Sequence, residues 1–283
     1  MLLDCKKEVN SINDLLNIEE KIIKSFKKQE TDLHTRNVLF FRGQSDYLWG
    51  LEPGIKRVDG LVEWKELQGY NANDYTLFEY IAKCQHYGKK TRFLDYSTDM
   101  DIALYFACNE NENKDGSLYI CPYVPRQSRW CDTIIISELS LLKNEIPVSD
   151  FSVQLFEKYS DFKDKYDGIA DLSKSIVSWL NHGFMVLPDK NEYEVIKEYN
   201  PRLCRQKGAF FICGNQTKKE LDSWSRLSTH AGYIIIIPKI CDIPDTIQKE
   251  ERVIKIRILS FMKKDIMEYL NGKGINKEYL LGE

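Results

Sequence analysis

Short runs of β-branched and aromatic residues constrain the fold of this chain more than any other feature. Each run is apolar and is bounded by polar residues or glycine, which is typical of buried strands. The runs are "NVLFFRGQ" (37–44), "SLYICPYV" (117–124), "GAFFICG" (208–214), "GYIIIIP" (232–238) and "RVIKIRIL" (252–259). Apolar residues at helical spacing mark the segments 11–26, 74–85, 98–109 and 171–180. Strands and helices alternate without the regular rhythm of βαβ units, so we expect an α+β fold.

No break in composition divides the chain. Its 283 residues are 43% hydrophobic and 29% charged, which is ordinary for a globular protein. The sequence has no repeat, low-complexity tract or linker rich in proline and glycine. We therefore expect one domain over residues 1–283, with 1–36 as a helical lead-in and 126–200 as a segment of mixed signals.

Charge, cysteine spacing and the length of apolar runs exclude several classes of protein. No apolar run reaches the roughly 18 residues of a membrane span, and the N-terminus lacks the apolar core of a signal peptide, so we expect a cytoplasmic protein without a membrane. The net charge of -3 gives no general attraction to nucleic acid, although a locally basic cleft is compatible with it. The 8 cysteines form no C-x-x-C pair, which indicates reduced core residues and no metal site.

The densest polar cluster is "QHYGKKTRFLDYSTDMDIALYFA" (85–107), which leads into an apolar helix. Its first residues, Gln85, His86 and Tyr87, fall at the C-terminus of a predicted helix that Gly88 ends. Histidine suits the negative end of a helix dipole. Alternatively, His86 or Tyr87 faces a ligand.

The centre of this cluster is short and extended. Thr91 precedes Arg92 and Asp95, which form an ion pair that pins a loop or else brace a site. Ser97 then leads to Thr98, which has an acid three residues later and matches a capping box. Thr98 is therefore the predicted N-cap of the next helix, whose free N–H groups also suit a phosphate.

Two further segments place cations beside a strand. Arg42 lies at the end of the strand 37–44, and Gly43 permits close approach of another backbone or of a ligand. An arginine there suits bidentate capture of phosphate or carboxylate, or pairs with a buried acid such as Asp95. Arg202 and Gln206 precede the strand 208–214, either in a solvated turn or in the same pocket as Arg42.

Several standard catalytic motifs are missing from the sequence. It contains no Walker A loop, no G-x-G-x-x-G, no G-x-S-x-G and no H-E-x-x-H. The corresponding phosphate-cradle, hydrolase and zinc-protease interpretations therefore lose their support.

Taken in order, "FFRGQ", "QHYGKKTRFLDYSTDMDIALYFA" and "NPRLCRQKGAFF" resemble the motifs of the FRG domain, a family named for its Phe-Arg-Gly. The resemblance runs from Asn37 to the closing segment "GKGINKEYLLG" and is weak over 126–200. FRG domains occur largely in bacteria and phages, often near defence or toxin–antitoxin genes. The resemblance implies an intracellular toxin or phage-defence effector with a possible antitoxin or regulatory partner.

"FRG" and "YSTDMDIALYFA" are also similar, in the right order, to the first two motifs of ADP-ribosyltransferases of the Arg-Ser-Glu type. This resemblance implies split sheets that form a cleft flanked by helices, with NAD⁺ as substrate and a nucleic acid or protein as acceptor. It implies a catalytic set of Arg42, Ser97, Thr98, Asp95 and Gln206. It implies NAD⁺ contacts from Arg42, Gln44, Gln85, His86, Tyr87, Thr91, Arg92 and Arg202.

The chain departs from that pattern at the third motif, where such enzymes carry a glutamate. The matching segment has Arg202 and Gln206 instead, so the acid would come from elsewhere, and Asp95 is a candidate. Two other interpretations stay open. One is a nucleotide or nucleic-acid binding module without chemistry, and the other is a nuclease or NAD⁺ hydrolase that uses Asp95 and His86.

Overall fold

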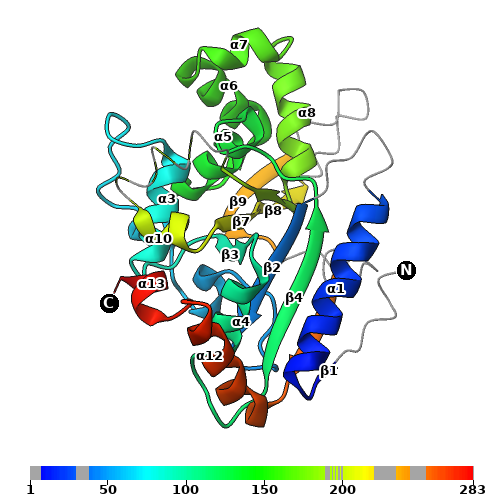
Figure 1. Ribbon diagram of the computed structural model, residues 1–283. Coiled ribbons are helices and arrows are strands. Elements are labelled where there is room, and N and C mark those ends of the chain that lie inside the picture. Colours follow the sequence, from blue (N-terminus) through cyan, green and yellow to red (C-terminus); the bar gives the residue numbers. More distant parts are fainter. Residues whose placement is uncertain are drawn as a thin grey trace.

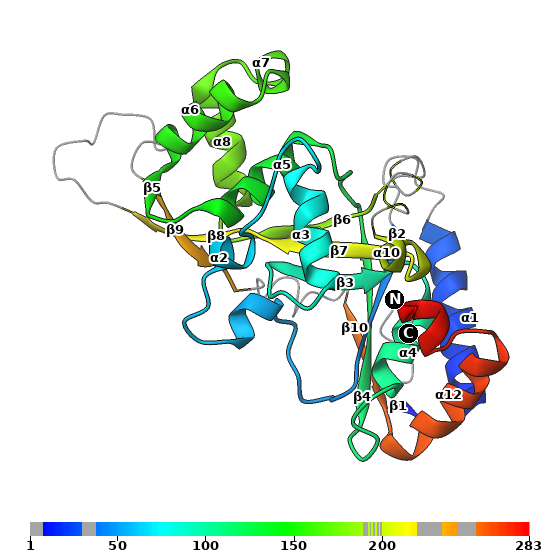
Figure 2. The same ribbon diagram turned by 90° about the vertical axis from the view of Figure 1, so that its left-hand side faces the viewer.

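The computed structural model describes residues 8–29, 38–188, 200–219, 234–242 and 253–282, with 192, 194, 196 and 198. Its centre is a seven-stranded sheet in the order β1-β10-β4-β2-β3-β7-β6 (Figures 1 and 2). Neighbouring strands are antiparallel except for the parallel pair β1 and β10. The strands are β1 (Glu8–Val9), β2 (Val38–Gln44), β3 (Phe93–Ser97), β4 (Gly116–Tyr123), β6 (Gly183–Val186), β7 (Gly208–Cys213) and β10 (Ile254–Ile258).

A smaller sheet and many short helices complete the described fold, which is α+β as expected. The three-stranded sheet has the order β5-β9-β8, formed by β5 (Ile146–Pro147), β9 (Ile234–Ile240) and β8 (Asn215–Lys219). The α-helices are α1 (Ile12–Gln29), α2 (Glu63–Glu66), α3 (Leu77–His86), α4 (Met100–Cys108), α5 (Cys131–Glu138), α6 (Val148–Lys158), α7 (Asp161–Lys165), α8 (Ile169–Trp179), α10 (Pro201–Arg205), α12 (Lys263–Gly272) and α13 (Lys277–Leu281). The 3-10 turns are η2 (Gly54–Arg57), η3 (Leu139–Leu141) and η5 (Ser260–Met262).

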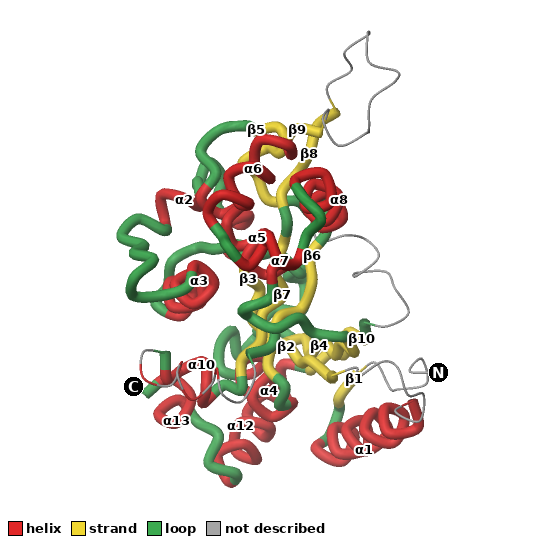
Figure 3. The backbone as a smooth tube through the Cα atoms, turned by 90° about the horizontal axis from the view of Figure 1, so that it is seen from above, coloured by secondary structure: helices red, strands yellow, loops and turns green. Residues whose placement is uncertain are grey.

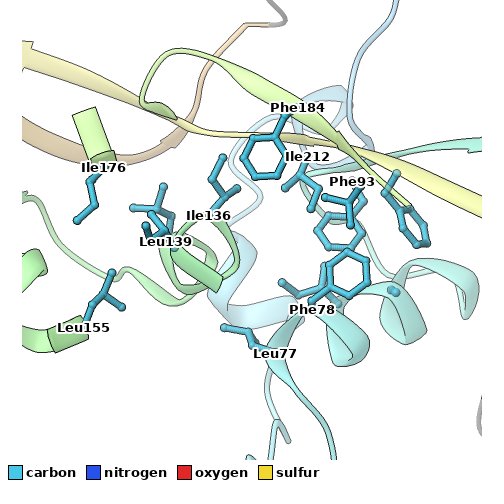
Figure 4. Close-up of a cluster of buried hydrophobic side chains, with 14 of the residues drawn as sticks. Leu77, Phe78, Phe93, Ile136, Leu139, Leu155, Ile176, Phe184 and Ile212 are labelled. Carbon is cyan, nitrogen blue, oxygen red and sulfur yellow. The ribbon is translucent and has the colours of Figure 1, made fainter. Parts of the chain in front are cut away.

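The helices gather in two groups, one at each end of the large sheet (Figure 3). Helices α1, α4 and α12 bury their apolar faces against β2, β4 and β10 in one cluster of side chains. Helices α3, α5, α6 and α8 pack with β3, β6 and β7 in a second cluster, part of which is shown in Figure 4. Phe78, Phe93 and Phe210 join α3 to the sheet there, with ring centroids 4.9–5.9 Å apart. This packing fixes the C-terminus of α3 beside β3, which is where the polar cluster of the sequence lies.

Most of the elements predicted from the sequence are present. The runs at 37–44, 117–124, 208–214 and 252–259 correspond to β2, β4, β7 and β10, and the described part of 232–238 lies in β9. Ser11 caps α1, since its Oγ accepts the N–H of Asp14 at 3.1 Å. Gly88 ends α3 with φ +88°. No disulfide joins the cysteines that the structure describes, and most of these cysteines are buried.

Two helix starts differ from the prediction, for the same reason. Helix α3 begins at Leu77 because Thr76 and Glu79 form a capping box, three residues after the predicted start. For α4 the predicted N-cap Thr98 is wrong. Asp99 holds that position, and its carboxylate accepts the N–H groups of Asp101 and Ile102. In both cases a neighbouring side chain satisfies the free N–H groups of the first turn.

No helix among the described residues is long and apolar enough to cross a membrane.

Candidate functional site

Strands β2 and β3 pair at one position only, Phe41 opposite Ser97. The rest of β2 toward Gln44 and the rest of β3 toward Phe93 have no pairing with each other, so the sheet opens between them. A pocket of about 350 Å³ lies at this opening. Side chains alternate along a strand, which places Phe41 on the α4 side of the sheet and Arg42 on the other side. Because the strands part, residues from both faces line one pocket.

The wall of the pocket combines the two main motifs of the sequence, the segments that follow β2 and α4, and two distant segments. It is lined by Phe41, Arg42, Gly43, Gln44, Ser45, Trp49, Arg57, Gln85, His86, Asp95, Tyr96, Ser97, Ile102, Ala103, Phe106, Asn109, Glu110, Arg202, Gln206 and Leu281. The distant segments are α10, with Gln206 directly after it, and α13, and these two helices lie side by side (Figure 2).

Gly43 is required by the packing of α4 against β2. A Cβ atom at this position would lie 1.8 Å from the carbonyl oxygen of Ala103 and 2.6 Å from the backbone nitrogen of Ala107. Of the two alternatives for Gly43, the close partner is therefore another backbone. The glycine of "FRG" brings α4, and with it Ile102 and Phe106, to the pocket.

Arg42 reaches across the opening from β2 to β3. Its Nη1 donates a hydrogen bond to the backbone carbonyl of Asp95 at 2.6 Å, so the predicted pairing with Asp95 is made to the main chain. Its Nε is buried and has no hydrogen-bond partner among the described residues. Burial lowers the pKa of Arg42, while the negative charge of Asp95 raises it. Arg57 adds a second guanidinium to the same wall.

Asp95 is held by a short chain of hydrogen bonds that begins at Thr91. The Thr91 hydroxyl donates to Gln85 Oε1 at 2.7 Å, which orients the Gln85 amide. Gln85 Nε2 then donates to Asp95 Oδ2 at 2.9 Å. The other carboxylate oxygen, Oδ1, has no hydrogen-bond partner in the described part of the chain and lies 3.9 Å from His86 Nε2. Oδ1 itself is buried, whereas 46% of the whole Asp95 side chain is exposed, so Asp95 lines the pocket with the remaining part of its side chain.

His86 contributes a neutral ring to the site. Its side chain is only 6% exposed, and its ring packs against Phe210 with centroids 5.8 Å apart. Burial lowers the pKa of His86 below 6.5, and this outweighs the opposite effects of Asp95 and Asn200. Nearby Arg202 lowers the pKa further. At neutral pH His86 is therefore uncharged.

Ser97, at the end of β3, and Arg202 and Gln206, at and after α10, also line the pocket. Ser97 Oγ donates to the carbonyl of Gln206 at 2.8 Å and accepts the N–H of Asp99 at 3.0 Å. Arg202 donates to the carbonyls of Leu281 and His86, at 2.9 and 3.1 Å. These residues share the pocket with Arg42, as one of the two sequence interpretations expected, and they also attach α13 to it.

Four of the predicted site residues do not line the pocket. Tyr87 is 61% exposed and its ring lies 6.0 Å from the guanidinium carbon of Arg202, and Thr91 is buried and bonded to Gln85. Thr98 donates its hydroxyl to the carbonyl of Lys207. The prediction that Tyr87, Thr91, Thr98 and Arg92 contact a ligand directly is therefore corrected. None of these four residues lines this pocket.

Arg92 is a structural residue, and its ion-pair partner is Glu63 rather than Asp95. The guanidinium is 1% exposed and makes a two-pronged contact with Glu63, at 3.0 Å from Nε and 2.7 Å from Nη2 to the same carboxylate oxygen. Its Nη1 donates to the carbonyls of Ile136 and Cys213 and to Asn215 Oδ1. All of its donors are thus directed at protein atoms.

Trp49 and Glu110 are among the residues of the pocket that were not assigned to it from the sequence. Trp49 comes from the segment after β2, and Glu110 follows α4. No motif marks them, and only the folding of their segments over the sheet opening brings them there. Glu110 is a second acidic residue of the pocket wall, and its carbonyl accepts a hydrogen bond from the buried ammonium of Lys263 at 2.8 Å.

No group of three or more His, Cys, Asp or Glu side chains converges among the residues that the structure describes.

Comparison with known proteins supports the main resemblance. No curated protein and no solved structure gives a significant match to this chain. The family model described as the FRG domain matches residues 37–116. That segment carries β2, α3, β3 and α4, which supply Arg42, Gly43 and Asp95 to the pocket. Residues 37–116 of this chain are therefore similar to the FRG domain.

Proposed function

We propose that the chain is an NAD⁺-dependent ADP-ribosyltransferase whose substrate binds at the opening between β2 and β3. The observation that carries the proposal is the meeting of Arg42 and Asp95 at a point where the sheet parts. This arrangement is similar to the split-sheet cleft implied by the Arg-Ser-Glu resemblance. It places a cation for phosphate, an oriented carboxylate and Ser97 within one pocket.

The pocket offers polar atoms that match the two ends of such a substrate. Arg42 Nε is a buried donor without a partner in the described residues, and the guanidinium of Arg57 lines the same wall, so both suit the diphosphate. Gln44 Oε1 is a buried acceptor that likewise lacks a described partner. It suits a hydroxyl or amide donor of the ligand, because a buried polar atom gains most from a hydrogen bond that it otherwise lacks.

The reaction requires cleavage of the bond between the nicotinamide nitrogen and the ribose carbon. Nicotinamide leaves with the electron pair of that bond, which leaves an oxocarbenium-like ribose. In the proposed mechanism the Asp95 carboxylate, oriented by Gln85, stabilises this positive charge. It then takes the proton of the acceptor nucleophile as that nucleophile bonds to the ribose carbon. Glu110 is the second carboxylate in reach of the pocket.

Label transfer tests the proposal. Purified protein is incubated with cell lysate and adenine-labelled NAD⁺, and label is measured separately in protein, RNA and DNA, together with free nicotinamide. We expect transfer by the wild type and a loss of at least about 100-fold in Arg42→Ala and Asp95→Asn. Arg129→Ala, an exposed arginine outside the pocket, is the matched control. Equal transfer by wild type and Arg42→Ala would exclude this site.

A biological role as an intracellular toxin or phage-defence effector forms part of this proposal. It is supported by the similarity of residues 37–116 to the FRG domain and by the settings in which that family occurs. Induced expression in bacterial cells should slow growth for the wild type but not for Arg42→Ala at equal protein level. If an Arg42→Ala protein that is folded but inactive in label transfer still inhibits growth, the toxicity does not depend on the pocket.

One observation favours a second candidate, a nucleotide-binding module without chemistry. The segment that should supply the catalytic glutamate supplies Arg202 and Gln206, which bind the carbonyls of α13. In that case nucleotide binds to the wild type and depends on Arg42, while no nicotinamide is released in any lysate fraction.

A further inference from the structure

Trp49 differs from the other tryptophans that the structure describes. Trp64 faces the ammonium groups of Lys65 and Lys143. Trp130 and Trp179 each have a hydrogen-bond acceptor and also the guanidinium of Arg126. For the Trp49 indole, no ring contact, cation or hydrogen bond is found within the described residues, although 42% of this residue is exposed. A large aromatic surface without a partner, at the edge of a pocket, indicates a binding surface.

The backbone that carries Trp49 is firmly held, so its exposure is not a result of a loose loop. The Trp49 N–H donates to the carbonyl of Asp46 at 3.2 Å, and its carbonyl accepts the Tyr119 hydroxyl at 3.2 Å. On either side, Lys255 Nζ donates to the carbonyl of Tyr47 at 2.6 Å and Gln44 Nε2 to that of Gly50 at 3.1 Å. The backbone that presents the indole is therefore held in place, which lowers the entropy cost of binding.

The surroundings of Trp49 favour a nucleotide as its partner. The pocket wall that includes Trp49 also includes Arg42 and the exposed Arg57, whose guanidinium donates to the carbonyl of Glu52 rather than to a carboxylate. A cation beside a free aromatic face is the combination that binds the phosphate and the base of one nucleotide. The pocket volume of about 350 Å³ is small for a dinucleotide, so part of such a ligand would extend over the rim.

We infer that Trp49 is a stacking platform for a nucleobase at the mouth of the pocket, with Arg57 binding the adjoining phosphate. This inference rests on the proposed function in taking a nucleotide as the ligand, and it adds the residue that recognises the base. The base has two possible sources, the adenine of NAD⁺ or a base of a single-stranded acceptor. Both present the same flat aromatic face to the indole.

Fluorescent etheno-adenine tests the inference, because stacking on an indole quenches its emission. The probes are etheno-AMP, etheno-NAD⁺ and a short single-stranded oligonucleotide that contains etheno-adenine, each titrated with purified protein. The variants are Trp49→Ala, Trp49→Phe and Arg42→Ala. Leu48→Ala is the matched control, since Leu48 is 88% exposed in the same loop but does not line the pocket. Circular dichroism confirms folding of each variant.

We expect quenching by the wild type, a loss of affinity of roughly tenfold in Trp49→Ala and a smaller loss in Trp49→Phe. If only the binding of etheno-NAD⁺ depends on Trp49, the stacked base is the adenine of the dinucleotide. If only the binding of the oligonucleotide depends on Trp49, the stacked base belongs to the acceptor. The inference is overturned if Trp49→Ala binds every probe as the wild type does, or if Leu48→Ala weakens binding equally. If either result overturns the inference, loss of binding in Arg42→Ala still supports the proposed function. Failure of the wild type to bind any probe would contradict both.

Discussion

At the scale of single residues, burial decides the state of His86. The unfolded chain has an ordinary histidine, whereas burial lowers the pKa in the folded chain below 6.5. Between those two pKa values the unfolded state binds more protons, so the free energy of unfolding falls as the pH decreases through that window. We expect the wild type to lose more stability than His86→Gln between about pH 7.5 and about pH 5.5, as measured by urea unfolding.

His182 provides the control for this pH effect, because it is exposed. His182→Gln should follow the pH dependence of the wild type. An unchanged pH dependence in His86→Gln would show that His86 is not protonated differently in the two states.

The requirement for glycine at position 43, in the Phe-Arg-Gly motif, has a steric cause. An added Cβ would meet the carbonyl of Ala103 at 1.8 Å, and backbone atoms of α4 cannot move as a flexible side chain does. We expect Gly43→Ala to lower the free energy of unfolding by about 2 kcal/mol or more, measured by urea unfolding. Gly50→Ala is the matched control, since nothing lies within 4 Å of its Cβ position. Equal stability of the two variants would contradict the packing of α4 on β2.

At the scale of elements, Arg92 joins parts of the chain that are far apart in sequence. It binds Glu63 at the start of α2, the carbonyl of Ile136 in α5, and the end of β7 at Cys213. Removal of the negative charge leaves a buried guanidinium without its counter-ion. We therefore expect Glu63→Gln to lower the free energy of unfolding by about 3–5 kcal/mol, measured by urea unfolding.

The exposed pair of Glu20 and Lys24 serves as the control for this prediction, because solvent screens it. Glu20→Gln should leave the unfolding midpoint unchanged. A Glu63→Gln variant as stable as the wild type would show that Arg92 is neutralised in some other way.

Elements with strong local signals were predicted correctly from the sequence, but some of their boundaries were not. The alternation of Ile254, Ile256 and Ile258 correctly predicted β10, because one face of that strand is buried. The start of α4 was misassigned by one residue. Thr98 and Asp99 both suit an N-cap, and the choice depends on Lys207, whose carbonyl accepts the Thr98 hydroxyl from another part of the chain.

At the scale of the whole molecule, the sheet order and most of the pocket's composition depend on contacts that no local pattern contains. Arg42 and Asp95 could be predicted as site residues because they lie in dense motifs. Trp49 and Glu110 could not, because only the opening between β2 and β3 brings them to Arg42. Arg92 lies in the same motif as Asp95, but it projects into the core rather than into the pocket.

The central claim is that the opening between β2 and β3 binds NAD⁺ through Arg42. Calorimetric titration of the purified protein with NAD⁺ tests it most directly, with Arg42→Ala and the remote Arg129→Ala measured beside the wild type. We expect saturable binding by wild type and Arg129→Ala, and an affinity at least about tenfold lower in an equally stable Arg42→Ala. Equal affinity of the wild type and Arg42→Ala, or no binding by a folded wild type, would contradict it.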